Sequence, residues 1–290
     1  MKLALFGINM GTLADPEAMA EAAQAAEAAG YESLWAGEHV VLPNPRTPDS
    51  PLPPRYPMLD PIVAFAHIAA ATSTIRLGTG IIILPQRNPV VLAKELASLD
   101  VVSRGRLIFG VGVGYLKPEF DAIGADFASR GARTDEYIAA IKALWTMEQP
   151  AFDGKFVSFA GVDAQPRPTQ QPHPPIVTGG WTRPALVRAV GSANGWYGYN
   201  MDVDAAAKHI AALKAAAETV ERPAGLGKLE ISITPPRAPI TLSMAEAYKH
   251  LGVDRLILQS TVRDKTAILA EIGENMATLG PAITHPSPRP

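Results

Sequence analysis

Short apolar stretches alternate with longer Ala-rich stretches along most of the chain. The short stretches are rich in β-branched, aliphatic or aromatic residues, which is typical of buried β-strands. The strands expected from this pattern cover residues 2–8, 33–36, 76–84, 106–111, 175–178, 195–199, 229–234 and 255–259. A stretch with helical character follows each strand, so the pattern predicts eight strand–helix units.

Capping residues mark where the helices begin. Three helices are expected to start with the same device, an Asp or Asn cap followed by proline: Asp15-Pro16, Asp60-Pro61 and Asn88-Pro89. These helices should end near residues 30, 72 and 103, and further helices are expected at 133–145 and from about 184, 204, 243 and 265. Ser243, with Glu246 three residues later, forms the pattern of a capping box.

Repeated strand–helix units predict a parallel sheet, and eight of them predict a closed (β/α)8 barrel of the TIM type. The 290 residues suit one such domain. We expect a single barrel over residues 1–280 and a flexible C-terminal tail over residues 281–290, where prolines are frequent.

Two segments interrupt the repeat. Residues 40–59 contain seven prolines, and residues 149–174 contain FDGKFVSF, which predicts a hairpin around Asp153-Gly154. We take both as insertions that follow barrel strands. Both are therefore expected to lie over the C-terminal mouth, where barrel enzymes hold their active sites.

The composition limits the chemistry. Hydrophobic residues make up 47% and charged residues 19%, and the net charge of -2 gives no support to binding of nucleic acid or of an acidic membrane. The chain has no cysteine, which excludes disulfides and thiolate catalysis. The six histidines show no metal-binding spacing, so no metal is expected. With no apolar run long enough to span a membrane and no signal-peptide pattern, we expect a cytoplasmic protein.

Glu38 and His39 come directly after the second strand and a glycine. In a barrel this position lies at the C-terminal rim, which favours a functional role over that of a surface Glu and a loop-capping His. The proton of a histidine side chain can move near neutral pH. The pair is therefore a candidate for acid–base chemistry.

Glycines are frequent where the third and fourth strands end. Gly78 and Gly80 lie within the third strand, and GVGVG covers residues 110–114. The spacing of the second group does not match a dinucleotide fingerprint, and the unit is not the first in the chain. Glycine lets a ligand approach the backbone closely, and two such positions side by side at the rim suit a planar aromatic ligand. A bulge that the curvature of the barrel requires would also explain glycine here.

The fifth strand runs into Gly179-Gly180, followed by Thr182 and Arg183 at the start of a helix. A glycine turn before a helix exposes free amides at the positive end of the helix dipole, which suits an anion such as phosphate. A tight turn without a ligand is the alternative.

Several motifs together resemble those of the luciferase-like monooxygenase superfamily, and most closely its branch that uses the deazaflavin coenzyme F420. These motifs are LWAGEH, LGTGIIILPQRNPVVLAKELASLDVVSRGRLIFGVGVGY, RTDEYIAAIKALW, FDGKFVSF, PIVTGG and NGWY. They occur in order over residues 1 to about 280. The resemblance is specific for the superfamily and says little about the substrate.

The resemblance implies roles for individual residues. Glu38, where many members have Asp, and His39 would lie beside the cofactor ring as the catalytic pair. A non-prolyl cis peptide is implied between Gly80 and Ile81. The residues expected to contact the cofactor are Glu38, His39, Thr79, Gly80, Ile81, Gly112, Val113, Gly114, Tyr115, Thr178, Gly179, Gly180 and Thr182, with Gly179, Gly180 and Thr182 at its phosphate.

The implied activity is hydride transfer between coenzyme F420 and a small organic substrate, with His39 as the proton partner. Relatives that oxidise sugar phosphates have Glu where this chain has Tyr115, so that substrate is not assigned. The alternatives are an FMN-dependent monooxygenase served by a partner reductase, a flavin-binding protein without turnover, and a barrel without a cofactor.

Substrate choice is expected to depend on the two insertions and on residues near Tyr115, Trp181 and Trp196, which favour a small, partly apolar molecule. The helix IVAFAHIAAAT is apolar or small nearly all round. A helix of this kind is usually buried, which in an outer ring predicts a homodimer, and the resemblance agrees.

Overall fold

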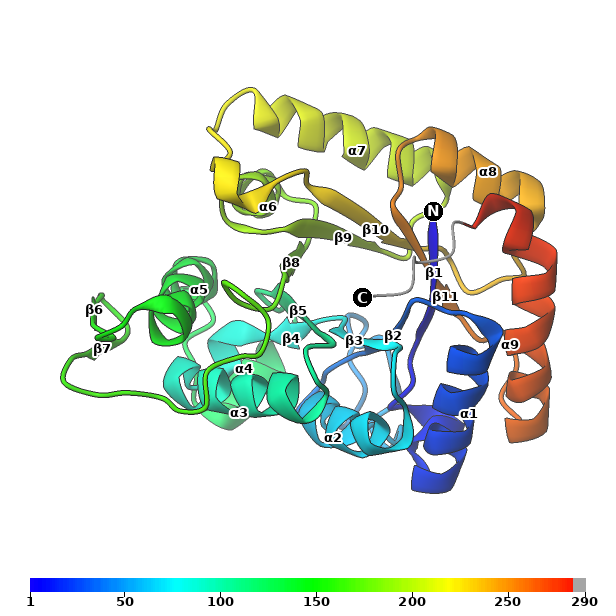
Figure 1. The fold of residues 1–290 in the computed structure, drawn as a ribbon, viewed down its shortest axis with the longest axis horizontal. Coiled ribbons are helices and arrows are strands. Elements are labelled where there is room, and N and C mark those ends of the chain that lie inside the picture. The colour runs from blue at the N-terminus through cyan, green and yellow to red at the C-terminus, as the bar shows by residue number, and fades with distance from the viewer. Residues whose placement is uncertain (284–290) are drawn as a thin grey trace.

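The computed structural model describes residues 1–283, in which eight parallel strands form a closed barrel surrounded by helices (Figure 1). In chain order the barrel strands are β1 (Lys2–Phe6), β2 (Ser33–Ala36), β3 (Arg76–Thr79), β5 (Leu107–Gly112), β8 (Ile176–Gly179), β9 (Gly195–Tyr199), β10 (Glu230–Thr234) and β11 (Arg255–Gln259). Neighbouring strands follow the order β3-β2-β1-β11-β10-β9-β8-β5, and pairing of β3 with β5 closes the ring. The predicted (β/α)8 barrel is confirmed.

The third predicted strand is divided in two. β3 ends at Thr79, and β4 (Ile82–Ile83) continues the pairing with β5. The peptide bond between Gly80 and Ile81, which joins them, is cis, as the resemblance implied.

The helices in the described chain are α1 (Pro16–Ala29), α2 (Pro61–Ala71), α3 (Pro89–Val102), α4 (Lys117–Ile123), α5 (Arg130–Thr146), α6 (Arg183–Ser192), α7 (Val203–Ala217), α8 (Leu242–His250) and α9 (Lys265–Leu279). Asp15, Asp60 and Asn88 accept hydrogen bonds from first-turn amides, so these three caps are confirmed. The predicted Ser243 cap is wrong. Thr241 caps α8 instead, because its hydroxyl accepts from the Met244 amide while Ser243 lies inside the helix. The sequence pattern did not predict α4.

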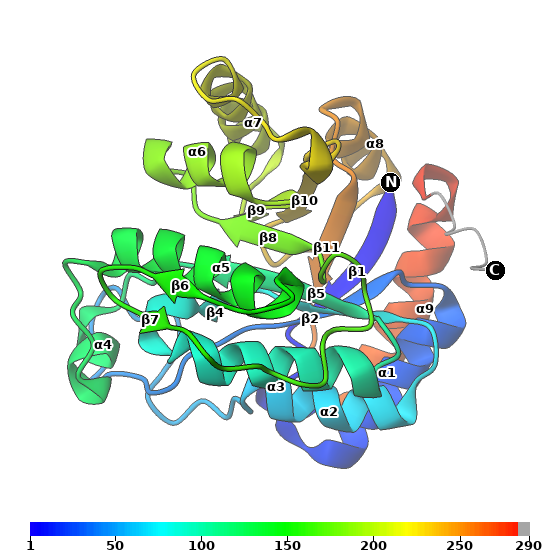
Figure 2. The ribbon, with the colours of Figure 1, turned by 60° about the vertical axis from the view of Figure 1, so that its left-hand side comes forward.

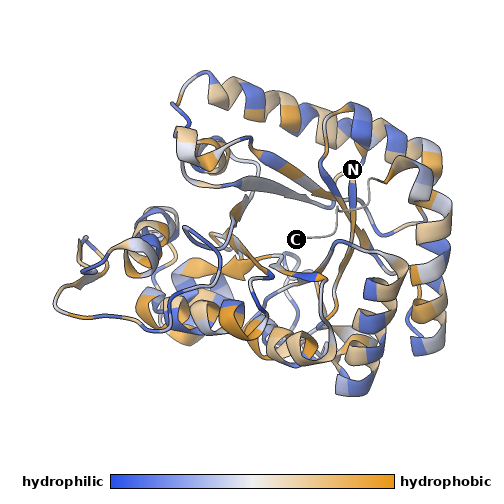
Figure 3. Ribbon diagram, viewed as in Figure 1, coloured by the Kyte–Doolittle hydropathy of each residue, from blue (hydrophilic) through white to orange (hydrophobic). Residues whose placement is uncertain are grey.

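The barrel strands are largely apolar and buried on both sides, and the helices carry both polar and apolar residues (Figure 3). One set of strand side chains points outward and packs with the helices. The other set fills the interior of the barrel and forms a separate cluster: Ala4, Phe6, Trp35, Ile108, Val177, Tyr197 and Ile257. The barrel is therefore a filled core, as is usual for eight strands.

Trp35 is the largest side chain of the interior cluster and is fully buried. A Cβ atom on Gly78 would lie 2.7 Å from the Trp35 ring, and one on Gly80 would lie 3.0 Å from it. Both contacts are closer than ordinary packing allows. Glycine in β3 therefore makes room for a tryptophan from the neighbouring strand, and contact of a ligand with Gly80 stays a prediction.

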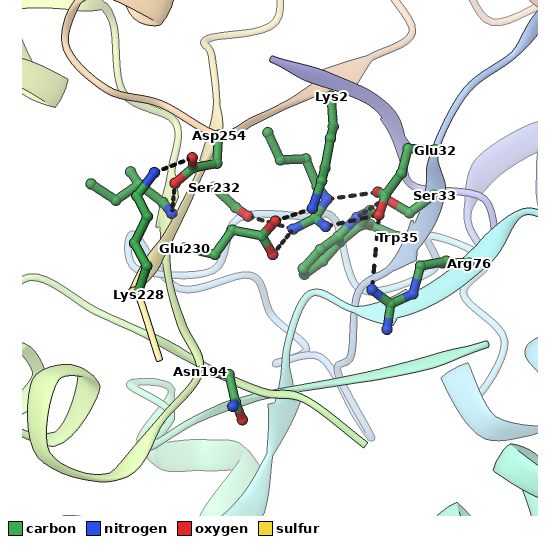
Figure 4. A network of polar contacts seen from close by, with 12 residues as sticks. Lys2, Glu32, Ser33, Trp35, Arg76, Asn194, Lys228, Glu230, Ser232 and Asp254 are labelled. Carbon is green, nitrogen blue, oxygen red and sulfur yellow. Dashed lines mark hydrogen bonds and ion pairs between the residues drawn. The ribbon is translucent and has the colours of Figure 1, made fainter. Parts of the chain in front are cut away.

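A network of charges closes the N-terminal end of the barrel below Trp35 (Figure 4). Arg255 is fully buried and donates to Glu32 at 2.8 and 3.0 Å and to Glu230 at 3.0 Å. Lys2 also pairs with Glu230. Burial raises the pKa of Glu32, but the Arg255 guanidinium, together with Arg76 and the Ser33 hydroxyl, lowers it to about 2.

The insertion at residues 40–59 lies at the C-terminal end of the barrel, as expected. Asn9, which is buried, donates to the carbonyls of Gly37 at 2.8 Å and Leu59 at 2.7 Å. The Gly11 amide donates to the Pro57 carbonyl. The β1–α1 loop therefore holds both ends of the insertion against the end of β2.

The insertion at residues 149–174 does not cover the mouth, which corrects the sequence-based expectation. It follows α5, which runs back from the mouth to the N-terminal end. Its hairpin, β6 (Phe152–Asp153) with β7 (Ser158–Phe159), is confirmed. The segment then passes along the outside of α3 and α5 (Figure 2). Gln170 bonds Asp100 at the end of α3 and the Leu107 carbonyl at the start of β5.

The last described residues extend the barrel slightly beyond the predicted boundary. A helical turn, Gly280–Ala282, buries Ala282 in the core, so residues 281–283 are not part of a free tail. The remainder of the predicted tail, residues 284–290, lies outside the described residues. No helix in residues 1–283 has the length and hydropathy required to cross a membrane.

The lowered pKa of Glu32 predicts a pH-dependent stability. A carboxyl whose folded pKa lies below its ordinary value of 4.5 stabilises the fold above that value, and this contribution is lost as the pH falls toward 2. Glu32→Gln removes this carboxyl and should lower the free energy of unfolding at pH 7. The difference in unfolding free energy between the natural chain and this variant should be smaller at pH 2 than at pH 7, by about 3 kcal/mol. Urea denaturation across this range measures the difference. A loss that does not change with pH would contradict the prediction.

Candidate active site

His39 and Glu119 form a pair at the rim of the barrel. His39 follows β2, and its side chain is 11% exposed. Its Nδ1 lies 3.2 Å from Oε2 of Glu119, which comes from α4 and is fully buried. The other Glu119 oxygen accepts from the Val40 amide at 2.5 Å. One buried carboxylate therefore contacts both the imidazole and the adjoining backbone.

Glu38, next to His39 in sequence, has different partners. Its carboxylate accepts from Arg87 Nε at 2.8 Å and from the Ile83 amide at 2.5 Å. Arg87 also pairs with Asp60 at 2.5 Å. Burial raises the pKa of Glu38, and Arg87 and the Ile83 amide oppose that rise. These contacts join the end of β2 to β4 and to the start of α2. They favour a positioning role for Glu38, and its catalytic role stays a prediction.

Ile81 covers the interior cluster on the side of the mouth, together with Met10. The Cδ1 atom of Ile81 fills the space beside Gly112, where a Cβ atom would lie only 2.3 Å from it. A Cβ on Gly179 would lie 3.5 Å from Ile81 Cγ2, an ordinary contact distance. Ile81 therefore forms a floor between the ends of β5 and β8.

The other glycines at the end of β5 are also explained by contacts within the protein. A Cβ on Gly110 would lie 1.8 Å from the Thr79 carbonyl oxygen, and the Thr79 hydroxyl already bonds the Gly110 backbone. Gly114 has a φ of +74°, and its Cβ would contact Phe120 of α4 at 2.8 Å. Glycine is therefore required here by packing, and cofactor contact by Thr79, Gly80, Gly112, Val113 and Gly114 stays a prediction.

The turn between β8 and α6 has free polar groups. Gly180 has a φ of +104°, and the Thr182 side chain makes no capping hydrogen bond to the α6 amides. The Thr178 hydroxyl is buried and has no hydrogen-bond partner among the described residues. Arg183 is exposed at the first position of α6. The amides at the start of α6, the exposed Thr182 hydroxyl and Arg183 fit an anion, because a phosphate would accept hydrogen bonds from them.

Exposed apolar side chains gather on the loops that surround the mouth. Five of the large exposed apolar residues follow or end barrel strands: Val40, Val41, Tyr115, Trp181 and Tyr199. The Tyr115 ring lies 6.1 Å from the His39 ring, edge to face. Burial, with smaller effects from Tyr199, Glu119 and Asp49, raises the pKa of Tyr115 to about 12. Tyr115 therefore presents an uncharged aromatic ring with a polar hydroxyl beside His39.

The structure brings most of the predicted site together at one end of the barrel, and three features differ. Trp196 is fully buried in the outer layer, where its Nε1 donates to the Gly180 carbonyl at 2.7 Å, so it supports the turn and does not line the mouth. Sequence reasoning missed Arg87, although the motif ILPQRNP contains it. It also missed Glu119, because the short helix α4 carries little periodic signal.

The described residues contain no group of three or more His, Cys, Asp or Glu side chains that could hold a metal ion.

Comparison with known proteins gives consistent matches. Residues 3–279 match the family of luciferase-like monooxygenases. An uncharacterised protein of Mycobacterium tuberculosis is 38% identical over 194 residues, which cover 64% of this chain and 68% of that protein. The oxygenase component of the flavin-dependent trigonelline monooxygenase of Acinetobacter baylyi is 33% identical over 185 residues, 61% of this chain and 48% of that protein.

Solved structures share the fold at low sequence identity. The coenzyme F420-dependent tetrahydromethanopterin reductase of Methanopyrus kandleri is similar with a TM-score of 0.75 and 16% identity, over 98% of this chain and 99% of that chain. This similarity supports the barrel architecture and its closure.

Proposed function

Because this chain belongs to the luciferase-like monooxygenase family, we propose that it is an oxidoreductase that uses coenzyme F420 to exchange a hydride with a small, partly apolar molecule. The observation that carries the proposal is the position of His39. It follows β2 at the rim, its side chain is 11% exposed, and its Nδ1 contacts the buried carboxylate of Glu119.

In this proposal each group of residues at the mouth has a separate role. Ile81 and the backbone of Gly179 support a flat ring, and the free amides at the start of α6 bind its phosphate. A deazaflavin, when bound, supplies a carbon that donates or accepts a hydride. His39 holds or gives the proton that accompanies the change at the substrate.

The apolar side chains at the mouth support the substrate class. Val40, Tyr115, Trp181 and Tyr199 offer exposed aliphatic and aromatic surface on the loops of the mouth, with the Tyr115 ring 6.1 Å from that of His39. Contact with such surface favours a substrate that has an apolar part. The polar group that reacts would lie toward His39.

A second candidate is an FMN-dependent monooxygenase that receives reduced flavin from a partner reductase. The observation that favours it is the 33% identity to a relative named as the oxygenase component of a flavin-dependent monooxygenase. The predicted Glu38-His39 pair favours the deazaflavin. Both cofactors present a planar ring and a phosphate, so the same floor and anion site would serve either one.

A direct test compares the two cofactors. Purified protein is titrated with F420 and with FMN, each oxidised and reduced, and binding is followed by cofactor fluorescence or absorbance. We expect F420 to bind at least tenfold more tightly, and no oxygen consumption with its reduced form. Tighter binding of reduced FMN, with oxygen uptake, would replace the proposal with the monooxygenase.

His39→Ala should lower turnover by about 10²–10⁴-fold, because it removes the proton partner. Cofactor affinity should change little, since the phosphate and the ring have other contacts. Steady-state kinetics and cofactor titration separate the two effects. His250→Ala on the exposed face of α8 is the control. An unchanged kcat in His39→Ala would count against the assignment.

Gly179→Asp should weaken cofactor binding, because it places a carboxylate next to the proposed phosphate site. A Cβ at this position makes only ordinary contacts with the protein. A side chain here would also meet a ring that lies on the Gly179 backbone, so the effect of the charge is measured by comparing two variants of the same shape. Gly179→Asn is the matched control, since it has the same shape without the charge. Fluorescence titration measures both affinities, and equal binding by the Asp variant and the Asn variant would reject the site.

We also propose a homodimer formed through α2 and α3. The side chains of Val63 on α2 and Val91 on α3 are 66% and 56% exposed. Val63→Glu should convert a dimer mass to a monomer mass in light scattering, while Val162→Glu, at a comparably exposed valine, should not. A monomer mass for the natural chain would refute the dimer.

A further inference from the structure

We propose that Glu119 is a positioning residue that fixes the orientation and the tautomer of the His39 imidazole. The proposal deepens the proposed function, because it rests on His39 being the proton partner at the mouth. Neither the family match nor the sequence motifs assigned a role to Glu119.

The geometry of Glu119 leaves little freedom. Its side chain is fully buried, and one oxygen accepts from the Val40 amide at 2.5 Å. This backbone contact fixes the plane of the carboxylate. The second oxygen then points at Nδ1 of His39, 3.2 Å away.

A carboxylate can only accept hydrogen bonds, so Nδ1 of His39 must donate its proton to Glu119. In the neutral ring this leaves Nε2 without a proton, as the nitrogen that can accept one at the mouth. The same carboxylate stabilises the imidazolium once Nε2 has taken a proton. The pair can thus hold a proton at a defined atom and release it.

The neighbouring charged groups do not replace this contact. Glu38 and Asp60 are both engaged by Arg87, and the groups that Glu119 contacts in the described chain are the Val40 amide and His39. Tyr115 approaches His39 with its ring edge and lies on the exposed side. The buried side of the imidazole is thus defined by Glu119.

A purely structural role is the alternative, in which Glu119 only anchors the loop through Val40. Glu119→Gln separates the two. The amide oxygen of Gln can keep the bond from Val40, but its NH2 group would then face Nδ1 and donate to it. The His39 ring would be forced into the other tautomer, with the proton on Nε2.

The test is the imidazole ¹⁵N spectrum of the protein without any cofactor, with the His39 signal assigned by its absence in His39→Ala. The natural chain should show Nδ1 protonated and Nε2 unprotonated, and Glu119→Gln should show the reverse. Asp121→Asn, a carboxylate-to-amide change on the exposed side of the same helix, should leave the tautomer unchanged. Glu119→Asp, which keeps the charge, should retain the natural tautomer.

A neutral His39 ring that carries its proton on Nε2 in the natural chain would overturn the proposal even if Glu119→Gln does not fold. An unchanged tautomer in a folded Glu119→Gln would also overturn it. In the loaded enzyme, kcat of Glu119→Gln should fall by about 10–100-fold with KM little changed. If the tautomer changes but kcat does not, the positioning role stands and the proposed use of His39 in turnover fails, so the two proposals are tested separately.

Discussion

The structure depends on how the barrel interior accommodates Trp35. This ring is fully buried, lies over the Arg255 guanidinium at 5.6 Å, and packs against the Tyr197 ring at 5.3 Å. Its space exists only because Gly78 and Gly80 carry no side chains. The interior is therefore filled in layers, with charges at the N-terminal end, aromatic rings in the middle, and a surface of small residues and Ile81 facing the mouth.

The two ends of the barrel consequently have different chemistry. At the N-terminal end Arg255 pairs with Glu32 and Glu230, and the lowered pKa of Glu32 reflects stabilisation of the fold. At the C-terminal end His39 is partly exposed, the amides of α6 lack a side-chain cap, and Thr178 lacks a partner in the described chain. An accessible histidine and free helix amides at the mouth are groups that a ligand site offers, whereas the paired charges at the other end serve the fold.

The sequence predicted the barrel and most of its boundaries, because proline-assisted caps and short apolar strands are local signals. It predicted the rim position of His39 for the same reason. Contacts between distant positions were out of reach: His39 meets Glu119 across 80 residues, and Glu38 meets Arg87 across 49. The packing role of the glycines of β3 and β5 was not predicted, because the sequence does not show which side chain fills the space beside each one. The insertion at residues 149–174 was misplaced because it follows a helix, and a helix returns the chain to the end opposite the mouth.

The central claim is that a planar cofactor lies on Ile81 with its phosphate at the start of α6 and its reactive edge beside His39. A crystal structure of the protein with F420 measures this most directly. We predict the ring against Ile81 and the backbone of Gly179, and Nε2 of His39 within hydrogen-bond distance of the substrate position at the ring edge. A ring bound elsewhere, or a phosphate away from Gly180 and Thr182, would contradict the account.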